Sequence, residues 1–414
     1  MDKVVSKSVI SGSLVAPTSK SALQRMIVAA FLSKGQSNIG YESTSEDAEA
    51  VIGVAESLGN SVTRTKHQLL IEGGKFKSAT INIGESGLGL RMVAPVLSAM
   101  NVPFRIEGRG SLLKRPLGFV LDGLQSCGVQ VSATGGSLPM SIMGPICTNS
   151  VTLDGSVGSQ LLTGFLFAAP LLNRDYEIRV INLKSKPYID LTISILNNFG
   201  IDIENSNYEG FLIRGGQVYK SCNCYAEGDW SGSAFVLVAA AIAGELNLTG
   251  IDVHSFQGDK KIKEVLKMCG ATVIEGINEI TVKKNELNAF EVDVTDEPDL
   301  FPPLVALAVN CAGQSVIKGV GRLKHKESDR AQTLQTEFNK LGANIRIVDD
   351  FMYIEGCKLK GTRVFSNHDH RIAMALAVAA ITAENETIIE NAESVGKSWP
   401  GFFEKFASIG AHVS

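Results

Sequence analysis

Six stretches of the chain repeat one order of hydrophobic and polar positions. In each, an apolar or β-branched strand precedes a short break rich in Gly, Ser or Asp, and an apolar helix follows the break. Ser, Asp and Asn are favourable N-cap residues, so the breaks are reasonable helix starts. The breaks recur about every 70 residues, a period that indicates repeated structural units. Helices are expected at 22–32, 88–100, 161–172, 233–243, 300–310 and 372–383.

Between the breaks, further helical segments end at a glycine, which supplies the left-handed C-terminal cap. These segments are 48–58, 118–127, 190–199, 260–269 and 330–341. Strands are expected after most of them, at 129–132, 201–203, 271–275 and 343–348. Each repeat is therefore predicted to be a β-α-β-α-β-β unit, with three units in each of two domains. The predicted fold class is α/β (α+β).

Composition narrows the class of protein. A chain of 414 residues is long for one core and favours two domains. Hydrophobic residues make up 44% and charged residues 20%, as in soluble globular proteins. The net charge of −4 disfavours a nucleic-acid partner. Since the longest apolar runs are about 10 to 12 residues, we expect neither a membrane span nor a secretory signal.

The cysteines agree with a cytoplasmic location. The seven cysteines are scattered, and the pair Cys222 and Cys224 fits neither a zinc knuckle nor a Cys-x-x-Cys redox motif. We therefore expect reduced thiols in a cytoplasmic protein.

Basic side chains recur near the predicted helix starts. They are Lys20 and Arg25, Arg91, Arg115, Lys326 and Arg330, Arg371 and Lys397. Taken singly, each would be explained as a solvated surface charge. As a set they indicate an anion site, because helix N-termini attract anions and guanidinium groups match phosphate and carboxylate oxygens.

Two carboxylates, Asp299 and Glu327, are candidates for proton transfer. Asp299 stands at a predicted helix start, where it could equally be an N-cap. Glu327 lies between Lys326 and Arg330, so a structural ion pair is also open.

Other chemistries have weaker support. His368 and His370 lack a third metal ligand at a fixed spacing, so no metal site is expected. A Gly-x-Ser-x-Gly elbow and a Walker loop are absent from the sequence, which disfavours serine nucleophiles and ATP-dependent transfer.

These residues, in this order, resemble the 5-enolpyruvylshikimate-3-phosphate synthase family along nearly the whole chain. The motifs that carry the resemblance are Ser19-Lys20-Ser21 with Arg25, Asp154-Gly155-Ser156-Val157-Gly158-Ser159-Gln160, Ser185-Lys186-Pro187-Tyr188-Ile189-Asp190, Lys326-Glu327-Ser328-Asp329-Arg330 and Asp369-His370-Arg371. The resemblance implies two similar domains, each an inverse α/β barrel of three β-α-β-α-β-β units, joined by a two-strand hinge. The first domain is expected at 18–228 and the second at 1–17 with 229–414, with the active site in the cleft between them.

The resemblance also implies an activity. Members transfer the enolpyruvyl group of phosphoenolpyruvate to the 5-hydroxyl of shikimate 3-phosphate, on the route to chorismate and the aromatic amino acids. The reaction proceeds by addition and elimination through a tetrahedral intermediate. No metal or organic cofactor is expected, the two substrates are the expected partners, and we expect a monomer.

Site residues follow from the family motifs, position by position. The residues expected to bind shikimate 3-phosphate are Lys20, Ser21, Arg25, Ser159, Gln160, Ser185, Tyr188, Asp299, Arg322 and Lys326. Those expected to bind phosphoenolpyruvate are Lys20, Gly87, Arg115, Gln160, Arg330, Arg371 and Lys397. Asp299 is the expected proton acceptor from the 5-hydroxyl, and Glu327 the expected proton donor to the methylene carbon, a role also discussed for Lys20.

Four positions depart from the commoner family pattern. Glu85 and Leu88 stand where many members have Asn and Thr, Gly158 replaces a frequent Ser, and Arg322 stands where some members have Asn. Leu88 leads us to expect weaker binding of glyphosate, which competes at the phosphoenolpyruvate site in this family.

Two alternatives stay open. One is the related cell-wall enolpyruvyl transferase that acts on UDP-N-acetylglucosamine, although its Cys-containing loop is not apparent near Arg115. The other is a repeat protein that binds anions without chemistry.

Overall fold

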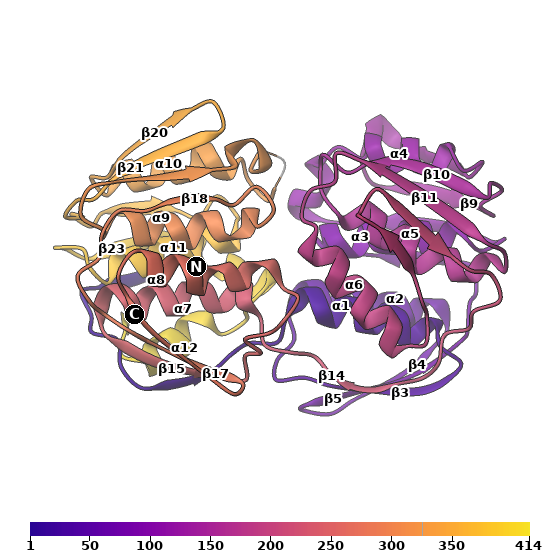
Figure 1. Cartoon of the computed structure of the whole chain (residues 1–414), viewed down its shortest axis with the longest axis horizontal. Coiled ribbons are helices and arrows are strands. Elements are labelled where there is room, and N and C mark those ends of the chain that lie inside the picture. Colours follow the sequence, from indigo (N-terminus) through magenta and orange to yellow (C-terminus); the bar gives the residue numbers. More distant parts are fainter. Residues whose placement is uncertain (325) are drawn as a thin grey trace. The chain divides into compact units, whose positions relative to one another are not determined.

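The computed structural model describes residues 1–324 and 326–414, which form two compact units. Lys20–Ala226 make up the N-terminal unit, coloured indigo to magenta in Figure 1. Glu227–Ser414 together with Met1–Ser19 make up the C-terminal unit. The chain therefore passes between the units twice, at Ser19–Lys20 and at Ala226–Glu227. Within the described residues, every helix is too short or too polar to cross a membrane.

The N-terminal unit consists of three four-stranded sheets and the helices that connect their strands. Its helices are α1 (Lys20–Leu32), α2 (Glu46–Leu58), α3 (Gly87–Ser98), α4 (Gly118–Gln125), α5 (Gln160–Ala168) and α6 (Pro187–Asn198), with 3₁₀ turns η1 (Gly110–Lys114), η2 (Thr134–Gly136) and η3 (Ala169–Leu172). Its strands are β3 (Gly35–Gly40), β4 (Ser61–Arg64), β5 (Gln68–Gly73), β6 (Ala79–Asn82), β7 (Pro103–Glu107), β8 (Gln130–Ala133), β9 (Met140–Met143), β10 (Ser150–Asp154), β11 (Tyr176–Ile181), β12 (Glu204–Ser206), β13 (Gly210–Ile213) and β14 (Asn223–Tyr225).

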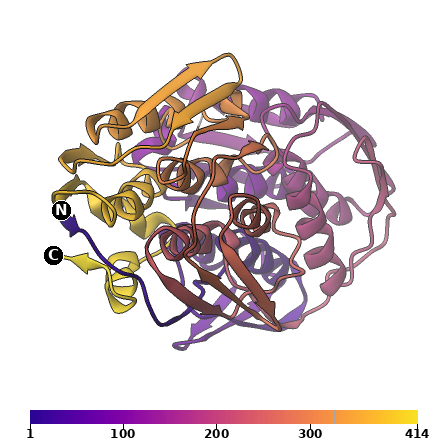
Figure 2. The ribbon, with the colours of Figure 1, turned by 60° about the vertical axis from the view of Figure 1, so that its left-hand side comes forward.

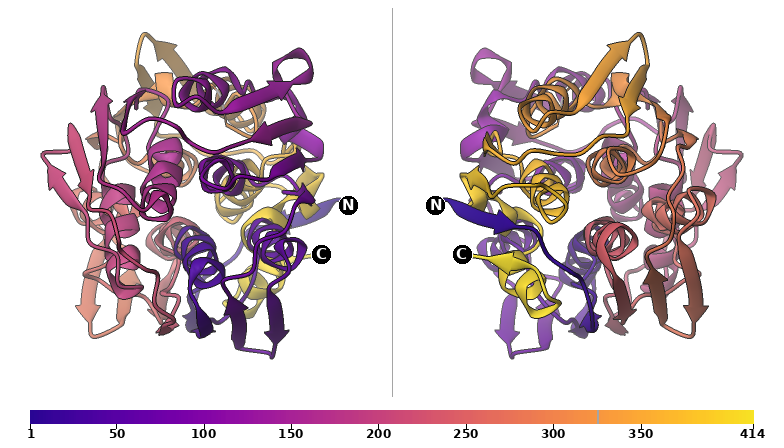
Figure 3. Two further views of the ribbon diagram at one scale, coloured as in Figure 1. Left: turned by 90° about the vertical axis from the view of Figure 1, so that its right-hand side faces the viewer. Right: turned by 90° about the vertical axis from the view of Figure 1, so that its left-hand side faces the viewer.

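The three sheets of this unit share one strand order: β14-β3-β5-β4, β6-β7-β9-β8 and β10-β11-β13-β12. In each, the first two strands are parallel and the others pair antiparallel. Side chains of β11 alternate between buried and exposed, as expected for a sheet with one solvated face. Figure 3 (left) shows the helices of this unit nearly end-on, inside the sheets.

The C-terminal unit repeats this plan. Its helices are α7 (Trp230–Ala243), α8 (Ile262–Met268), α9 (Phe301–Ala308), α10 (Arg330–Lys340), α11 (His370–Ala380) and α12 (Phe402–Ser408), with 3₁₀ turns η4 (Gly258–Lys261), η5 (Pro298–Leu300), η6 (Val320–Arg322) and η7 (Ala392–Lys397). Its strands are β1 (Lys3–Ser6), β2 (Ser13–Val15), β15 (Glu245–Thr249), β16 (Thr272–Gly276), β17 (Glu279–Lys283), β18 (Glu291–Asp293), β19 (Gln314–Lys318), β20 (Asn344–Val348), β21 (Phe351–Glu355), β22 (Arg363–Phe365), β23 (Thr387–Glu390) and β24 (His412–Val413).

The first residues of the chain complete two sheets of this unit. Strand β2 pairs with β15 in the sheet β16-β17-β15-β2, and β1 lies between β23 and β24 in the sheet β22-β23-β1-β24. Figure 2 shows this indigo segment running beside the yellow C-terminal strand. The third sheet, β18-β19-β21-β20, contains no strand from the N-terminal segment.

Central helices carry the core of each unit. Every residue of α7 and α11 is buried, because both helices are apolar on all sides. Figure 3 (right) shows helices of the C-terminal unit nearly end-on within its sheets. Burying such helices inside the sheets removes most of their apolar surface from water, which is the main stabilising term of the fold.

The predicted fold class is confirmed, and the predicted helices are found within a few residues of their expected ends. One local prediction was wrong, and one of the alternatives left open for Asp299 is excluded. Residues 201–203 form no strand, because Ile201 is buried against the end of α6 and β12 begins at Glu204. Asp299 is not an N-cap, because it lies inside η5 and α9 begins at Phe301.

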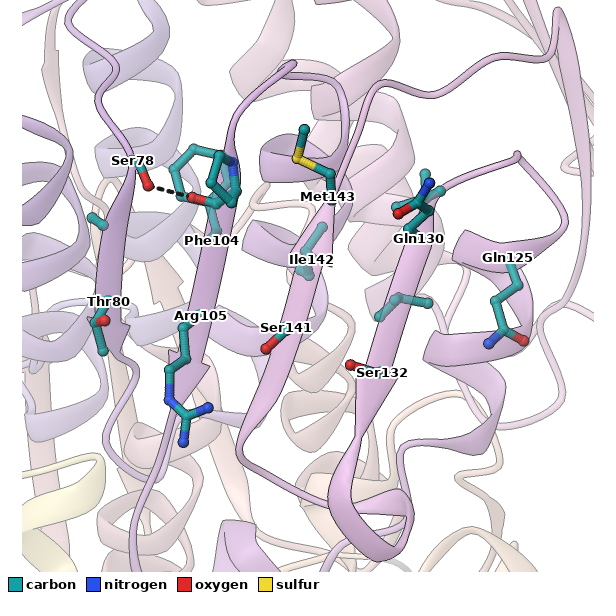
Figure 4. Close-up of a pocket in the computed structure, with 14 residues that line it drawn as sticks. Ser78, Thr80, Phe104, Arg105, Gln125, Gln130, Ser132, Ser141, Ile142 and Met143 are labelled. Carbon is teal, nitrogen blue, oxygen red and sulfur yellow. Dashed lines mark hydrogen bonds between the residues drawn. The ribbon is translucent and has the colours of Figure 1, made fainter.

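The outer face of the sheet β6-β7-β9-β8 forms a shallow pocket that is separate from the candidate site residues (Figure 4). Polar side chains such as Thr80, Arg105, Ser132 and Ser141 line it, and Ser78 Oγ donates a hydrogen bond of 2.6 Å to the Pro103 carbonyl beside it. Arg105 also pairs with Glu107 at 2.9 Å, so its charge is already balanced.

Candidate active site

Arg330, at the start of α10, contacts two of the expected site residues, Asp299 and Glu327, and also the buried Asp369. Its Nε donates to Asp369 Oδ2 at 2.7 Å, its Nη1 to Asp299 Oδ1 at 2.7 Å, and its Nη2 to Glu327 Oε2 at 2.6 Å. The side chain is 1% exposed. Burial alone would lower its pKa, but the charges of Asp369, Glu327 and Asp299 raise it. Arg330 therefore stays charged and connects the two candidate carboxylates, Asp299 and Glu327.

Asp299 is surrounded by three cations. Besides Arg330, Lys326 Nζ lies 3.3 Å from Oδ1 and Arg371 Nη2 lies 3.2 Å from Oδ2. Burial would raise the pKa of Asp299, but Arg371, Lys326 and Arg330 together hold it well below its usual range. The carboxyl group is consequently ionised at neutral pH, as a proton acceptor must be.

The pKa of Lys326 is lowered, and burial is the largest cause. Burial lowers its pKa, with help from the charges of Arg330 and Arg322, while Asp299 and Glu327 raise it. Its contact with Asp299 is the main direct restraint on its ammonium group among the described bonds. Lys326 therefore combines a fixed position with reduced basicity.

Asp369 holds Arg330 and the start of α11 in place, a role that the sequence reasoning missed. It is the N-cap of α11, accepting from the Arg371 backbone N–H at 3.0 Å, and it also accepts from Ser328 Oγ at 3.1 Å. The side chain is completely buried. Its capping position was visible in the sequence, but its contact with Arg330 spans 39 residues and has no local signal. Asp369 thus fixes the start of α11 and the Arg330 guanidinium together.

Lys397 and Arg322 lie at the edges of the group. Lys397 Nζ donates to the His368 carbonyl at 2.9 Å, in the turn just before α11. Arg322 Nε donates to the Thr295 carbonyl at 3.2 Å, and burial lowers the Arg322 pKa against the attraction of Asp296 and Asp299. Within residues 1–324 and 326–414, His, Cys, Asp and Glu side chains form no group of three that could hold a metal ion.

Arg25 is the centre of the second group, in the N-terminal unit. It is 1% exposed, and its Nε donates to Thr192 Oγ1 at 2.8 Å. Its Nη1 donates to the Ser21 carbonyl at 2.8 Å and its Nη2 to the Tyr188 carbonyl at 3.4 Å. Burial lowers the pKa of Arg25 to about 10, so it remains charged at neutral pH. Thr192 was missed because it lies two residues beyond the recognised motif, in α6.

Lys20, the first residue of α1, is held by an acidic partner that the sequence did not indicate. Its Nζ lies 3.0 Å from Asp47 Oδ2, and both side chains are largely buried. Asp47 is in the first turn of α2, whose N-cap is Ser45. The pair restrains the lysine beside the start of α1 without removing it from solvent.

Arg115 and Arg91 lie at the N-terminus of α3, and Arg91 connects it to Gln160, the first residue of α5. A Cβ placed on Gly87 would lie 2.6 Å from Arg115 Nη1 and 3.4 Å from Arg91 Nη1, so both guanidinium groups lie against the start of α3. Arg91 Nη1 in turn donates to Gln160 Oε1 at 2.6 Å. Gly164 allows this approach, because a Cβ there would collide with the Arg91 carbonyl oxygen of α3.

The two serines expected near a phosphate, Ser159 and Ser185, are both buried. Ser159 is the N-cap residue of α5 but makes no side-chain cap bond, so its hydroxyl is not used by the helix. Ser185 has φ of 59°, a strained conformation for a residue other than glycine. Gly158 has φ of 139°, a conformation that glycine adopts without strain.

The expected site residues divide between the two units, and we call the two sets the C-terminal group and the N-terminal group. Asp299, Arg322, Lys326, Glu327, Arg330, Arg371 and Lys397 belong to the C-terminal group. The N-terminal group consists of Lys20, Ser21, Arg25, Gly87, Arg115, Ser159, Gln160, Ser185 and Tyr188. Both groups are rich in partly buried cations and suit anionic ligands with several phosphate and carboxylate oxygens.

Comparisons with known proteins match this chain to one enzyme family. The family model for EPSP synthase (3-phosphoshikimate 1-carboxyvinyltransferase) matches residues 4–406. The 3-phosphoshikimate 1-carboxyvinyltransferase of Clostridium kluyveri is 38% identical over 409 residues, which are 98% of this chain and 96% of that protein. The enzyme of the same name from Methanocorpusculum labreanum is 36% identical over 420 residues, covering 100% of this chain and 99% of that protein.

Solved structures give the same result. EPSP synthase from Acinetobacter baumannii has a TM-score of 0.84 at 26% identity, covering 100% of this chain and 99% of its own. The enolpyruvyl transferase NikO from Streptomyces tendae has a TM-score of 0.80 at 18% identity, covering 100% and 98%, and supports the fold alone.

Proposed function

From the premise that the chain belongs to the EPSP synthase (3-phosphoshikimate 1-carboxyvinyltransferase) family, we propose which residues hold its substrates and move the protons. The enzyme transfers the enolpyruvyl group of phosphoenolpyruvate to shikimate 3-phosphate and releases phosphate. We place the reaction in a cleft to which the N-terminal domain, about 18–228, and the C-terminal domain, 1–17 with 229–414, each contribute one of the two groups.

Shikimate 3-phosphate is assigned mainly to the N-terminal group. Lys20, Ser21 and Arg25 begin α1, and Ser159 and Ser185 are buried serines of the same unit. The 3-phosphate would take hydrogen bonds from the serine hydroxyls and the charge of Lys20, while Tyr188 lies along the ring. Gln160, Asp299, Arg322 and Lys326 would complete the contacts. Arg25 supports the assignment, because its guanidinium is already locked by three acceptors and needs little reorganisation on binding.

Phosphoenolpyruvate is assigned to cations of both groups. Arg115 with Gly87, Gln160 and Lys20 would hold it from the N-terminal unit, and Arg330, Arg371 and Lys397 from the C-terminal unit. Arg371 is well suited, because its Nη1 is buried without a hydrogen-bond acceptor among the described residues. Several fixed cations would stabilise the phosphate charge that develops as the C–O bond breaks.

Asp299 and Glu327 are assigned to proton transfer. Asp299 accepts the proton of the 5-hydroxyl as its oxygen attacks C2 of phosphoenolpyruvate, while Glu327 protonates C3; Lys20 is the other candidate for that donor. The tetrahedral intermediate then loses phosphate from C2 and a proton from C3, which restores the C2–C3 double bond and gives the enol ether product. Overall, the hydroxyl proton leaves with the phosphate, and no oxidant, metal or organic cofactor is required.

The observation that carries the assignment is the contact of Asp299 with Lys326, Arg330 and Arg371. In the free chain these cations lower its basicity. An anionic substrate bound beside Arg330 and Arg371 would offset their positive charge and so raise the pKa of Asp299 at the moment when it must accept a proton. Substrate binding would therefore activate the base.

A phosphate-release assay with Asp299→Asn tests this assignment. We expect turnover to fall by about 10²- to 10⁴-fold, the usual contribution of a general base, while shikimate 3-phosphate binding stays measurable. Asp293→Asn, an exposed exchange in the same segment, is the matched control. Near-normal turnover of Asp299→Asn would remove Asp299 as the base.

The same assay separates the alternatives. Phosphate release with UDP-N-acetylglucosamine but not with shikimate 3-phosphate would indicate the cell-wall reaction, and release with neither would indicate an anion-binding protein. We also propose that the enzyme acts as a cytoplasmic monomer without a metal. Light scattering should give the mass of one chain, and activity should persist in a chelator.

A further inference from the structure

The turn between β6 and α3 holds a carboxylate that substrate binding does not explain. Glu85 Oε2 accepts hydrogen bonds from the Ser111 backbone N–H at 2.9 Å and from Ser111 Oγ at 2.8 Å. Ser111 belongs to η1, the 3₁₀ turn that ends immediately before Arg115. Glu85 is therefore bonded to the segment that carries a proposed phosphoenolpyruvate ligand.

The fit between this turn and η1 is tight. Gly110 has φ of 56°, and a Cβ at this position would collide with the Glu85 carboxyl group, so only glycine leaves room for the contact. The backbone joins as well, because the Arg109 N–H donates to the Gly84 carbonyl at 2.8 Å. The start of η1 is thus attached by a main-chain bond and by a side chain that accepts two bonds.

The other end of η1 is placed by the same turn. The Arg115 N–H donates to the Leu112 carbonyl at 3.2 Å, which closes the 3₁₀ turn. The Arg115 guanidinium lies against Gly87, only two residues after Glu85. Hence Glu85 fixes where η1 begins, and the rigid turn carries Arg115 to the N-terminus of α3.

We propose that Glu85 is a positioning residue that orients Arg115 for phosphoenolpyruvate through Ser111. This inference rests on the proposed role of Arg115. A carboxylate suits the position because bonds to an ionised acceptor are shorter and about twice as strong as neutral ones. It also keeps the anionic side chain facing η1, where two donors hold it away from an anionic ligand.

Steady-state kinetics of Glu85→Ala give the first test. We expect KM for phosphoenolpyruvate to rise about tenfold, which corresponds to about 1.4 kcal/mol, with KM for shikimate 3-phosphate unchanged. Glu85→Gln should recover most of this loss, since its amide oxygen still accepts from Ser111. Ser111→Ala, which keeps the backbone bond, should give a smaller rise. Glu107→Gln, a partly exposed exchange in the neighbouring strand β7, is the control.

A double-mutant cycle with Arg115→Ala separates this inference from the proposed function. If Glu85 acts through Arg115, Glu85→Ala should change KM for phosphoenolpyruvate no further in the Arg115→Ala background. A normal KM in Arg115→Ala alone would refute the role of Arg115. Two outcomes would overturn the role of Glu85 when Arg115→Ala alone has a strong effect. In one, the Glu85→Ala, Glu85→Gln and Ser111→Ala variants keep the KM values of the unaltered protein for both substrates. In the other, the effects of Glu85→Ala and Arg115→Ala are fully additive.

Discussion

Glu297, two residues before Asp299, should make the stability of the C-terminal unit fall as the pH rises. Burial raises the pKa of this carboxyl group to about 7, with Asp259 and Asp296 adding to the effect and Lys261 opposing it. The substitution to test is Glu297→Gln, which removes the titrating carboxyl group and keeps the size and shape of the side chain. Lys261 would lose its ion pair with Glu297 at 3.2 Å but keep its bond to the Asp293 carbonyl at 2.7 Å.

The sign and size of the effect follow from linkage. Between the ordinary glutamate pKa of 4.5 and the folded value of about 7, the unfolded chain binds fewer protons than the folded one. Its free energy of unfolding therefore decreases with rising pH across this interval. The full difference corresponds to about 3 kcal/mol, of which about 2.5 kcal/mol should be lost between about pH 5 and about pH 8.

Urea unfolding followed by tryptophan fluorescence reports on the C-terminal unit, where this effect is expected. The chain has two tryptophans, Trp230 and Trp399, and both belong to the C-terminal unit. We expect the free energy of unfolding of Glu297→Gln to depend less steeply on pH than that of the unaltered protein. Glu291→Gln, an exposed exchange on β18, should leave the dependence as it is. Parallel pH profiles for Glu297→Gln and the unaltered protein would refute the reasoning.

Two further predictions concern charge and shape at the site. Asp369→Asn should lower the free energy of unfolding of the C-terminal unit by about 3 kcal/mol, because it leaves the buried Arg330 with only Asp299 and Glu327; an unchanged urea midpoint by tryptophan fluorescence would contradict this. Leu88→Thr should strengthen inhibition by glyphosate, and an inhibition constant equal to that of the unaltered protein would show that Leu88 does not weaken its binding.

Local sequence rules predicted much of the fold. The breaks at Ser86, Asp229 and Asp369 are N-caps whose side chains accept from the helix backbone, as their residue types indicated. The spacing of Glu327 and Arg330 also indicated an ion pair, which is present at 2.6 Å. Such signals depend on neighbours along the chain, so they are readable before any tertiary structure is known.

Contacts between distant elements were not predictable in this way. Arg25 and Thr192 are 167 residues apart, and Lys20 and Asp47 are 27 apart. No period or cap motif relates these positions, since they meet only because α1 packs against α6 and α2. The family resemblance identified Lys20 and Arg25, whereas their partners Asp47 and Thr192 appeared only with the fold.

The strands β1 and β2 have a consequence for the order in which the chain assembles. The N-terminal unit is one continuous segment, so it is able to fold as soon as it leaves the ribosome. The C-terminal unit has to wait, because β1 pairs with β23 and β24, which are made after the other strands of this unit. During synthesis the first residues therefore remain unpaired strand edges, and removing them would open two sheets of the C-terminal unit at once.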